Sequence, residues 1–234
     1  MHTSARAVAG LILAAFVLTA CTPDVSGARR ATPVPTGSAS GDAAATPEAG
    51  EDTDMPPTDI TFEAGAELDP ASWRAGWDDR LMAADERFAV SSPDDGNGSW
   101  AYLDAQTQCS IAFYQGAITD LELGADDRES TDGMLAAVLS TQIPGVTAAD
   151  VTANASDDYV AQTTQEGTVE IRLVGGSGGG GGSEAGWSEF GRTFGTLGTS
   201  LVVNVECPPG QDVGTEVADL LNEYVGIAIA PASD

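Results

Sequence analysis

Residues 87–114, RFAVSSPDDGNGSWAYLDAQTQCSIAFY, decide the fold of this chain. Two apolar runs, 87–91 and 99–103, flank a segment whose Gly and Asn residues supply the positive φ angles of a tight turn. A second polar turn leads to a third run at 109–114, where Ile111 and Phe113 alternate with smaller residues. This pattern predicts an antiparallel meander of three strands.

Four further strands are predicted toward the C-terminus, at 159–163, 168–174, 187–194 and 199–207. The glycine tract 175–183 lies between the second and third of them and has no phosphate-loop lysine, so we interpret it as a hairpin tip rather than a nucleotide-binding loop.

Three helices are predicted. The first opens at Asp69-Pro70 and places Trp73, Trp77 and Leu81 on one face, although Gly76 weakens it. The second runs from Asp126 to about residue 141, with acids in its first turn. The third closes the chain at 212–225, after the break at 208–210.

This order of elements resembles the Mog1/PsbP-like fold of several actinobacterial lipoproteins, including the LpqN-type group. The shared features are the strand Phe88-Ala89-Val90-Ser91-Ser92-Pro93, the meander, the central helix, a glycine-interrupted hairpin, the strand Leu201-Val202-Val203-Asn204-Val205 and a final amphipathic helix. The resemblance implies a single α+β domain over residues 59–234, with an antiparallel β-sheet packed between α-helices. It further implies a binding or assembly role rather than catalysis, and it transfers no functional residue.

The N-terminus carries an export signal at residues 1–20. Arg6 precedes an apolar core of about eleven residues, which is shorter than the roughly 20 that span a bilayer. Leu18-Thr19-Ala20-Cys21 resembles the lipobox of bacterial lipoproteins, which implies that diacylglycerol (with a further acyl chain such as palmitate) is attached to Cys21. We therefore expect a protein lipid-anchored on the extracytoplasmic face of the cell membrane; an ordinary secretory peptide is the alternative.

Residues 21–58 are rich in Pro, Thr, Ala, Ser, Gly and acids and have no aliphatic periodicity. Such a segment cannot bury enough apolar surface to offset its ordering entropy. We expect a disordered stalk that carries the folded domain away from the bilayer.

Cys21, Cys109 and Cys207 are the three cysteines of the chain. If lipid occupies Cys21, the remaining even pair in an exported protein predicts a Cys109–Cys207 disulfide, with two buried free thiols as the alternative. Because each of the two cysteines lies in a predicted strand, the bridge is expected to tie two parts of one sheet. In the chain-entropy account, a disulfide that closes a loop of about 100 residues adds about 4.7 kcal/mol to the free energy of unfolding.

The composition excludes much chemistry. All nine basic residues are arginines, against 36 acids, and the only histidine is His2 in the predicted signal. Without mature His or Lys there is no Ser-His-Asp triad, imidazole metal ligand or Schiff-base lysine. A net charge of −27 disfavours nucleic acid and favours a dispersed monomer. No cofactor or metal is predicted; the segment beginning at Asp95 only partly matches a calcium loop.

The function expected from the sequence is a non-enzymatic binding or assembly module of the cell envelope, with an envelope protein or small ligand as partner. The alternatives are a carboxylate-only hydrolase acting on extracellular or cell-wall glycans, and an envelope component without a discrete site. No catalytic residue is assigned. Four aromatic residues near predicted turns are candidates for a binding surface, although aromatic residues of sheets are more often core: Trp100, Tyr102, Trp187 and Phe190.

Overall fold

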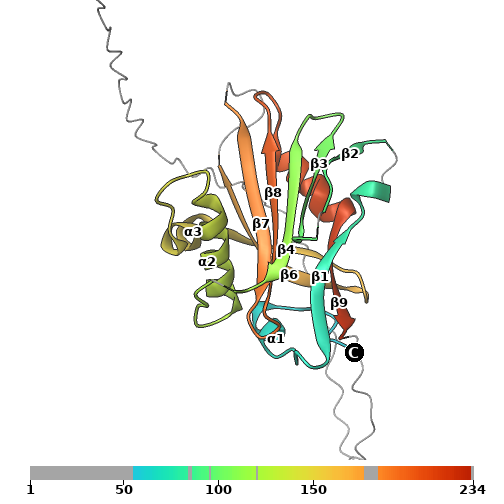
Figure 1. Cartoon of the computed structure of the whole chain (residues 1–234), viewed down its shortest axis with the longest axis vertical. Coiled ribbons are helices and arrows are strands. Elements are labelled where there is room, and N and C mark those ends of the chain that lie inside the picture. Colours follow the sequence, from blue (N-terminus) through green and yellow to red (C-terminus); the bar gives the residue numbers. More distant parts are fainter. Residues whose placement is uncertain (1–54, 84–85, 95, 120, 177–183, 233–234) are drawn as a thin grey trace, which may run out of the picture. The chain divides into compact units, whose positions relative to one another are not determined.

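A nine-stranded mixed sheet curled into a half-barrel forms the centre of the domain (Figure 1). The computed structural model describes residues 55–83, 86–94, 96–119, 121–176 and 184–232, so the predicted signal, Cys21 and most of the predicted stalk lie outside the described residues. The strands are β1 (Trp73–Asp79), β2 (Phe88–Ser92), β3 (Ser99–Asp104), β4 (Ser110–Ala117), β5 (Ser156–Gln162), β6 (Gly167–Gly176), β7 (Gly186–Phe194), β8 (Thr199–Cys207) and β9 (Val225–Pro231).

Helices occupy both faces of this sheet. They are α1 (Phe62–Ala66), the 3₁₀ turn η1 (Leu81–Ala83), α2 (Asp127–Leu139), α3 (Ala148–Asn154), α4 (Val213–Asp219) and the π-helical turn η2 (Leu220–Tyr224). The domain therefore has both sheet and helix, as predicted, but it is mostly sheet.

The strand order is β1-β9-β5-β6-β7-β8-β4-β3-β2. The sheet is mixed rather than antiparallel throughout, which corrects the expected antiparallel sheet at one pair: β9 runs parallel to β5 through Ala161↔Gly226 and Gln162↔Ile227. The chain reaches β9 through α4 and η2 rather than through a hairpin, and such a crossover permits a parallel pair.

The predicted meander is confirmed as β2, β3 and β4. Trp100 pairs with Phe113 and Tyr102 with Ile111, in an antiparallel register. Gly96 and Gly98 in the β2–β3 turn have φ angles of 93° and 76°, the left-handed conformation that the sequence predicted there. The four later predicted strands are also present, as β5 to β8, and β6 and β7 pair as a hairpin whose tip, 177–183, lies outside the described residues.

The helix predicted from Asp69 to Leu81 was wrong, because this segment is a turn followed by strand β1. The Asp69 carboxylate accepts hydrogen bonds from the Ala71 amide and the Ser72 hydroxyl, so the capping chemistry closes a turn instead of a helix. Trp73 and Trp77, four residues apart, share a face in a strand as well as in a helix. Gly76 disfavours the helix, and the aromatic residues favour the strand.

The predicted C-terminal helix, 212–225, is confirmed as one continuous helical segment that consists of α4 and the π-helical turn η2 and ends at Tyr224. The chain then forms β9, a strand that we had not predicted. Val225, Ile227 and Ile229 are almost completely buried and alternate with Gly and Ala, which is a period-two pattern.

The central helix α2 is confirmed, with the Asp126 side chain capping its N-terminus through the Glu129 amide. Its buried residues include Met134, Leu135 and Leu139, as predicted. Helix α3, which was not predicted, follows with a capping box between Thr147 and Asp150.

The Cys109–Cys207 disulfide is present, with a Cα–Cα distance of 4.2 Å. Cys109 precedes β4 and Cys207 ends β8, and these two strands are antiparallel neighbours. The bridge therefore ties two parts of one sheet, as predicted.

Two hydrophobic cores lie on opposite faces of the sheet. The concave core fills the half-barrel and includes residues of α4 and η2. The α2-side core is smaller and lies under α2 and α3. Members of the concave core include Phe113, Ile171, Phe190, Val203, Val217, Leu220 and Ile227, and members of the α2-side core include Met134, Leu135, Leu139, Val151, Val174 and Val202.

Candidate functional site

The open side of the half-barrel is closed by side chains rather than by strand pairing. Trp77 of β1 reaches across the barrel to β4, where its indole N–H donates to the Tyr114 carbonyl at 3.0 Å. Its backbone N–H donates to Oε1 of Gln115 at 2.9 Å. The same indole packs edge-on against Phe113 and Phe190, with ring centroids 6.0 and 6.1 Å apart. We call this junction of β1 with β3 and β4 the seam.

Asp79, at the end of β1, holds the other end of the seam. Its Oδ2 accepts hydrogen bonds from Trp100 Nε1 at 2.9 Å and from the Tyr102 hydroxyl at 2.6 Å, both on β3. Its Oδ1 accepts from the Leu81 amide at 2.9 Å. Burial and the hydrogen bond to Asp79 raise the pKa of Tyr102, so this hydroxyl stays a donor.

A pocket of about 420 Å³ opens beside Asp79, and we call it the seam pocket. Two exposed hydrophobic side chains frame it: Met82 is 72% exposed and Val90 is 48% exposed. Trp100 also lines this pocket, and one face of its indole stacks on Phe113 with the ring centroids 5.2 Å apart. The lining residues are Asp79, Met82, Val90, Pro93, Asp94, Trp100 and Tyr102.

Both carboxylates of the seam pocket already accept hydrogen bonds. Asp79 has the three donors described above, and Asp94 Oδ1 accepts from the amides of Gly96 and Gly98 at 2.9 and 3.2 Å. A glycosidase of the carboxylate type needs one acid that donates a proton and a second that acts as base or nucleophile. Here the two carboxylates serve as acceptors that fix the seam and the β2–β3 turn.

The structure brings together two of the four aromatic residues that the sequence singled out. Trp100 and Tyr102 share the seam pocket, although Tyr102 is only 4% exposed. Phe190 is completely buried in the concave core, which removes it from any binding surface. Trp187 of β7 lines a separate pocket of about 290 Å³, together with Val217 of α4 and Leu221 of η2.

Sequence reasoning missed five residues of the pocket: Asp79, Met82, Val90, Pro93 and Asp94. The helix predicted for 69–81 concealed Asp79, because it placed Trp77 and Asp79 on different faces. In a strand, residues two apart share a face. Reading Trp73, Ala75, Trp77 and Asp79 as one alternating series would have directed Asp79 toward the aromatic residues.

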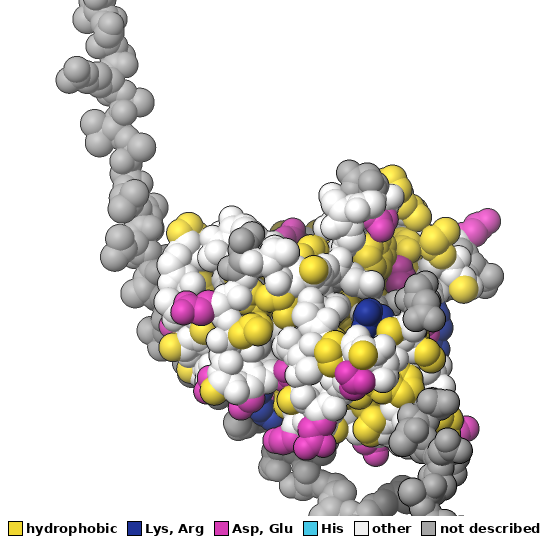
Figure 2. Space-filling model, turned by 60° about the horizontal axis from the view of Figure 1, so that its bottom comes forward, with side chains coloured by type: hydrophobic (Ala, Val, Ile, Leu, Met, Phe, Trp, Pro, Cys, Tyr) yellow, Lys and Arg dark blue, Asp and Glu magenta, His cyan; other side chains and the backbone are white. Residues whose placement is uncertain are grey.

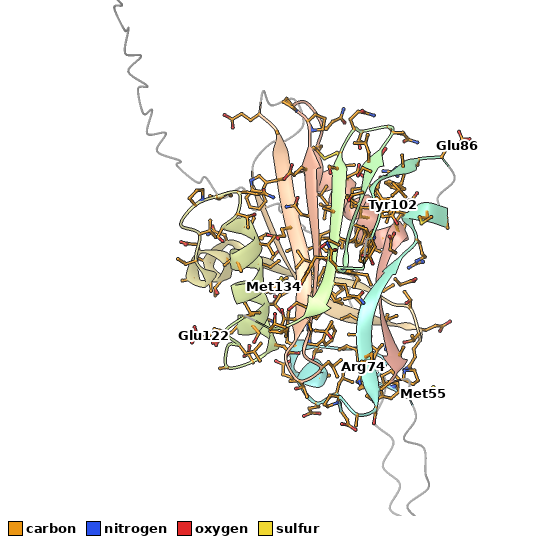
Figure 3. All side chains as sticks on the ribbon, viewed as in Figure 1. Met55, Arg74, Glu86, Tyr102, Glu122 and Met134 are labelled. Atoms are coloured by element: carbon orange, nitrogen blue, oxygen red, sulfur yellow. A yellow bond between two sulfur atoms is a disulfide. The ribbon has the colours of Figure 1, made fainter. Side chains whose placement is uncertain are left out.

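Figure 3 shows Tyr102 on the opposite side of the domain from Met134 of α2 and from Glu122. The face of α2 has its own hollows, of about 420 and 320 Å³, which share Tyr114 and Val138 as lining residues. They carry no aspartate or glutamate in their lining. The seam pocket therefore differs from these two hollows, because acidic side chains join aromatic and apolar ones in its wall.

Glu189 of β7 is a buried carboxyl group outside the seam. It is completely buried and its two oxygens have no hydrogen-bond partner, so desolvation raises its pKa to about 8. Its register partner on β8 is Asn204, whose side-chain amide nitrogen is likewise buried and unpartnered.

A metal centre has no basis among the described residues, because no three His, Cys, Asp or Glu side chains gather there. Asp95, the first residue of the partial calcium motif, lies outside them. The surface in Figure 2 shows scattered acidic side chains and few basic ones.

Comparisons with models of protein families, with curated proteins and with solved structures found no match to this chain. In the part of the chain that the structure describes, no helix is long and apolar enough to cross a membrane.

Proposed function

We propose that this chain is a lipid-anchored extracytoplasmic protein whose folded domain binds a partner of the cell envelope without catalysis. The observation that carries the proposal is the seam pocket. It combines exposed apolar side chains with two aromatic residues that are held in place by Asp79. Aromatic and apolar walls with a few fixed polar groups are typical of binding sites.

Anchoring at Cys21 is the second part of the proposal. The lipobox-like Leu18-Thr19-Ala20-Cys21 supports it. The Cys109–Cys207 disulfide is consistent with export, since disulfides persist in oxidising compartments. Of the three cysteines, Cys21 is the one outside this bridge, and two or more acyl chains on it would give stable membrane attachment.

The resemblance to the Mog1/PsbP-like lipoproteins belongs to the same proposal. A meander, a central helix, a hairpin around the glycine tract and a late helix occur here in the expected order. Strands β1 and β9 add to that order, since the resemblance did not include them.

A carboxylate-only glycan hydrolase is the alternative, because the seam pocket does place Asp79 and Asp94 beside Trp100 and Tyr102. The hydrogen bonds argue for binding instead. Asp79 accepts three donors and Asp94 two, so both acids are engaged in holding the fold.

Photo-crosslinking in intact cells tests this proposal. A photoreactive amino acid at Met82, on the rim of the seam pocket, should give a discrete adduct in the membrane fraction. The matched control is the same amino acid at Tyr159, which is 54% exposed and lines none of the pockets described here; it should give none. Absence of an adduct at Met82, or the same adduct from both positions, would overturn the binding role of the pocket.

The same cells test the anchor. In a Cys21→Ser chain that carries the photoreactive group at Met82, the protein should leave the membrane fraction and the adduct should diminish. Full membrane retention of this variant would contradict lipid attachment at Cys21.

A further inference from the structure

We infer that the seam pocket binds an organic cation, namely an ammonium or guanidinium head carried on an apolar stem. This inference rests on the proposed binding function, because it names the ligand chemistry of the same pocket. The charge balance of the pocket, its aromatic wall and its apolar rim all fit such a ligand.

The arginines of the described domain are engaged away from the pocket. Arg80, Arg87, Arg128, Arg172 and Arg192 each form an ion pair with a carboxylate, and none of them lines the seam pocket. Arg74 donates to backbone carbonyls of its own segment. The pocket therefore has two carboxylates in its wall and no basic side chain.

Neutral donors orient Asp79 but do not neutralise it. Its three hydrogen bonds come from a backbone amide, an indole and a phenol, none of which carries a charge. An ionised carboxylate offers roughly four lone-pair positions, so one acceptor position remains on Oδ1. A cationic head group would supply both the missing donor and the missing positive charge.

Trp100 supplies the matching aromatic wall. Indole attracts a cation over its face more strongly than the other aromatic side chains do. Phe113 covers one face of this indole and the hydrogen bond to Asp79 fixes its plane, so the opposite face is the one available to a cation. The carboxylate and the π face thus bound the same space.

The rim selects against other ligands. Met82, Val90 and Pro93 offer apolar surface for a stem. An anion would meet Asp79 and Asp94 without a compensating base. A fully apolar ligand would cover Asp79 without supplying a donor, which is costly for a carboxylate.

Binding is measured on the mature chain with Cys21→Ser, by following the Trp100 indole N–H resonance in nuclear magnetic resonance titrations. The probes are choline, its uncharged isostere dimethylbutanol, and arginine amide. We expect saturable shifts with choline or arginine amide, and binding of dimethylbutanol at least tenfold weaker than choline. A preference for choline identifies a small amine as the source of the cation, and a preference for arginine amide identifies a basic protein segment.

Asp79→Asn removes the charge while keeping a hydrogen-bond acceptor, and it should weaken the binding of the cation about fivefold or more. The matched control, Glu122→Gln, removes the same charge from an exposed site across the domain and should leave the affinity unchanged. Added salt should weaken the binding of choline but not that of dimethylbutanol.

Equal binding of choline and dimethylbutanol, or no shift with either cation, overturns the inference. These comparisons use unmodified pocket residues, so they do not depend on the folding of the Asp79 variant. If a Met82 adduct forms in cells while no cation binds, the proposed binding function stands and the cation chemistry alone fails.

Discussion

The concave face of the sheet packs aliphatic and aromatic side chains against α4, whereas the opposite face carries arginines and carboxylates beneath α2. On β6 the two kinds of face alternate along one strand. Val169 and Ile171 are completely buried in the concave core. Glu170 and Arg172, on the other face, are 8% and 5% exposed and form ion pairs.

The ion pairs connect α2 with two strands. Arg172 Nε lies 2.7 Å from Asp132 Oδ1 of α2, and Arg172 Nη1 lies 2.8 Å from Asp157 Oδ1 of β5. Asp157 also pairs with Arg128, near the start of α2, which in turn reaches Glu170 at 3.3 Å. The result is a chain of alternating charges from the middle of the helix to its first turn.

The two faces of the sheet differ in how strictly they fix the position of the helices that pack on them. Apolar packing tolerates many arrangements of similar volume, whereas a buried charge is satisfied only in one register. The small α2-side core would by itself permit α2 to shift along the sheet. We infer that the ion pairs fix its position, whereas the larger concave core supplies most of the burial.

The largest expected effect comes from breaking the buried ion pair. Asp132→Ala leaves Arg172 buried without its main partner and should lower the free energy of unfolding by about 3–5 kcal/mol. The double variant Asp132→Leu with Arg172→Met, which replaces the pair by apolar groups, should recover most of this loss. Urea denaturation monitored by circular dichroism measures both. A small effect of Asp132→Ala alone would contradict the assigned role of the pair.

The sequence predicted the elements whose signals are local. Gly96 and Gly98 marked the β2–β3 turn, and Asp126 marked the start of α2, because positive φ angles and N-caps are requirements of single residues. The disulfide also followed from counting cysteines, once Cys21 was assigned to lipid.

The seam was not predictable in the same way. Trp77 contacts Phe113 and Phe190, which lie far along the chain, and its four-residue spacing from Trp73 fits a helix and a strand equally. In the strand order, β1 is joined to the rest of the sheet through the pairing of β9 with β5, and this pairing is non-local. The candidate site depends on this pairing, so the sequence supplied Trp100 and Tyr102 but not Asp79.

The buried carboxyl group of Glu189, on the α2-facing side of the sheet, should make the stability of the protein depend on pH. Its pKa in the folded protein, about 8, lies above the ordinary value of 4.5. The folded state therefore holds the proton more tightly, and the free energy of unfolding should fall as the pH rises from about 4.5 to about 8. Glu189→Gln removes this slope. Its effect on the free energy of unfolding should therefore be more stabilising at pH 8 than at pH 4.5, by about 2–4 kcal/mol.

Thermal unfolding at a series of pH values measures the slope. Glu206→Gln, an exposed acid on the neighbouring strand β8, is the matched control and should leave the slope unchanged. A gain that is equal at both pH values would show that Glu189 is not the titrating group.

The smallest expected effect concerns the closure of the concave face at the seam. Gln115→Ala removes the acceptor of the Trp77 backbone amide and should lower the free energy of unfolding by about 1 kcal/mol, the usual net value of one hydrogen bond. Gln142→Ala, at an exposed position after α2, should change it by less than about 0.5 kcal/mol. Because the variant removes the acceptor of the Trp77 amide, it should also speed hydrogen exchange at this amide. The amides of β6, which lies away from the seam, should stay protected. Uniform acceleration across the sheet would instead mean that the seam and the rest of the barrel unfold as one unit.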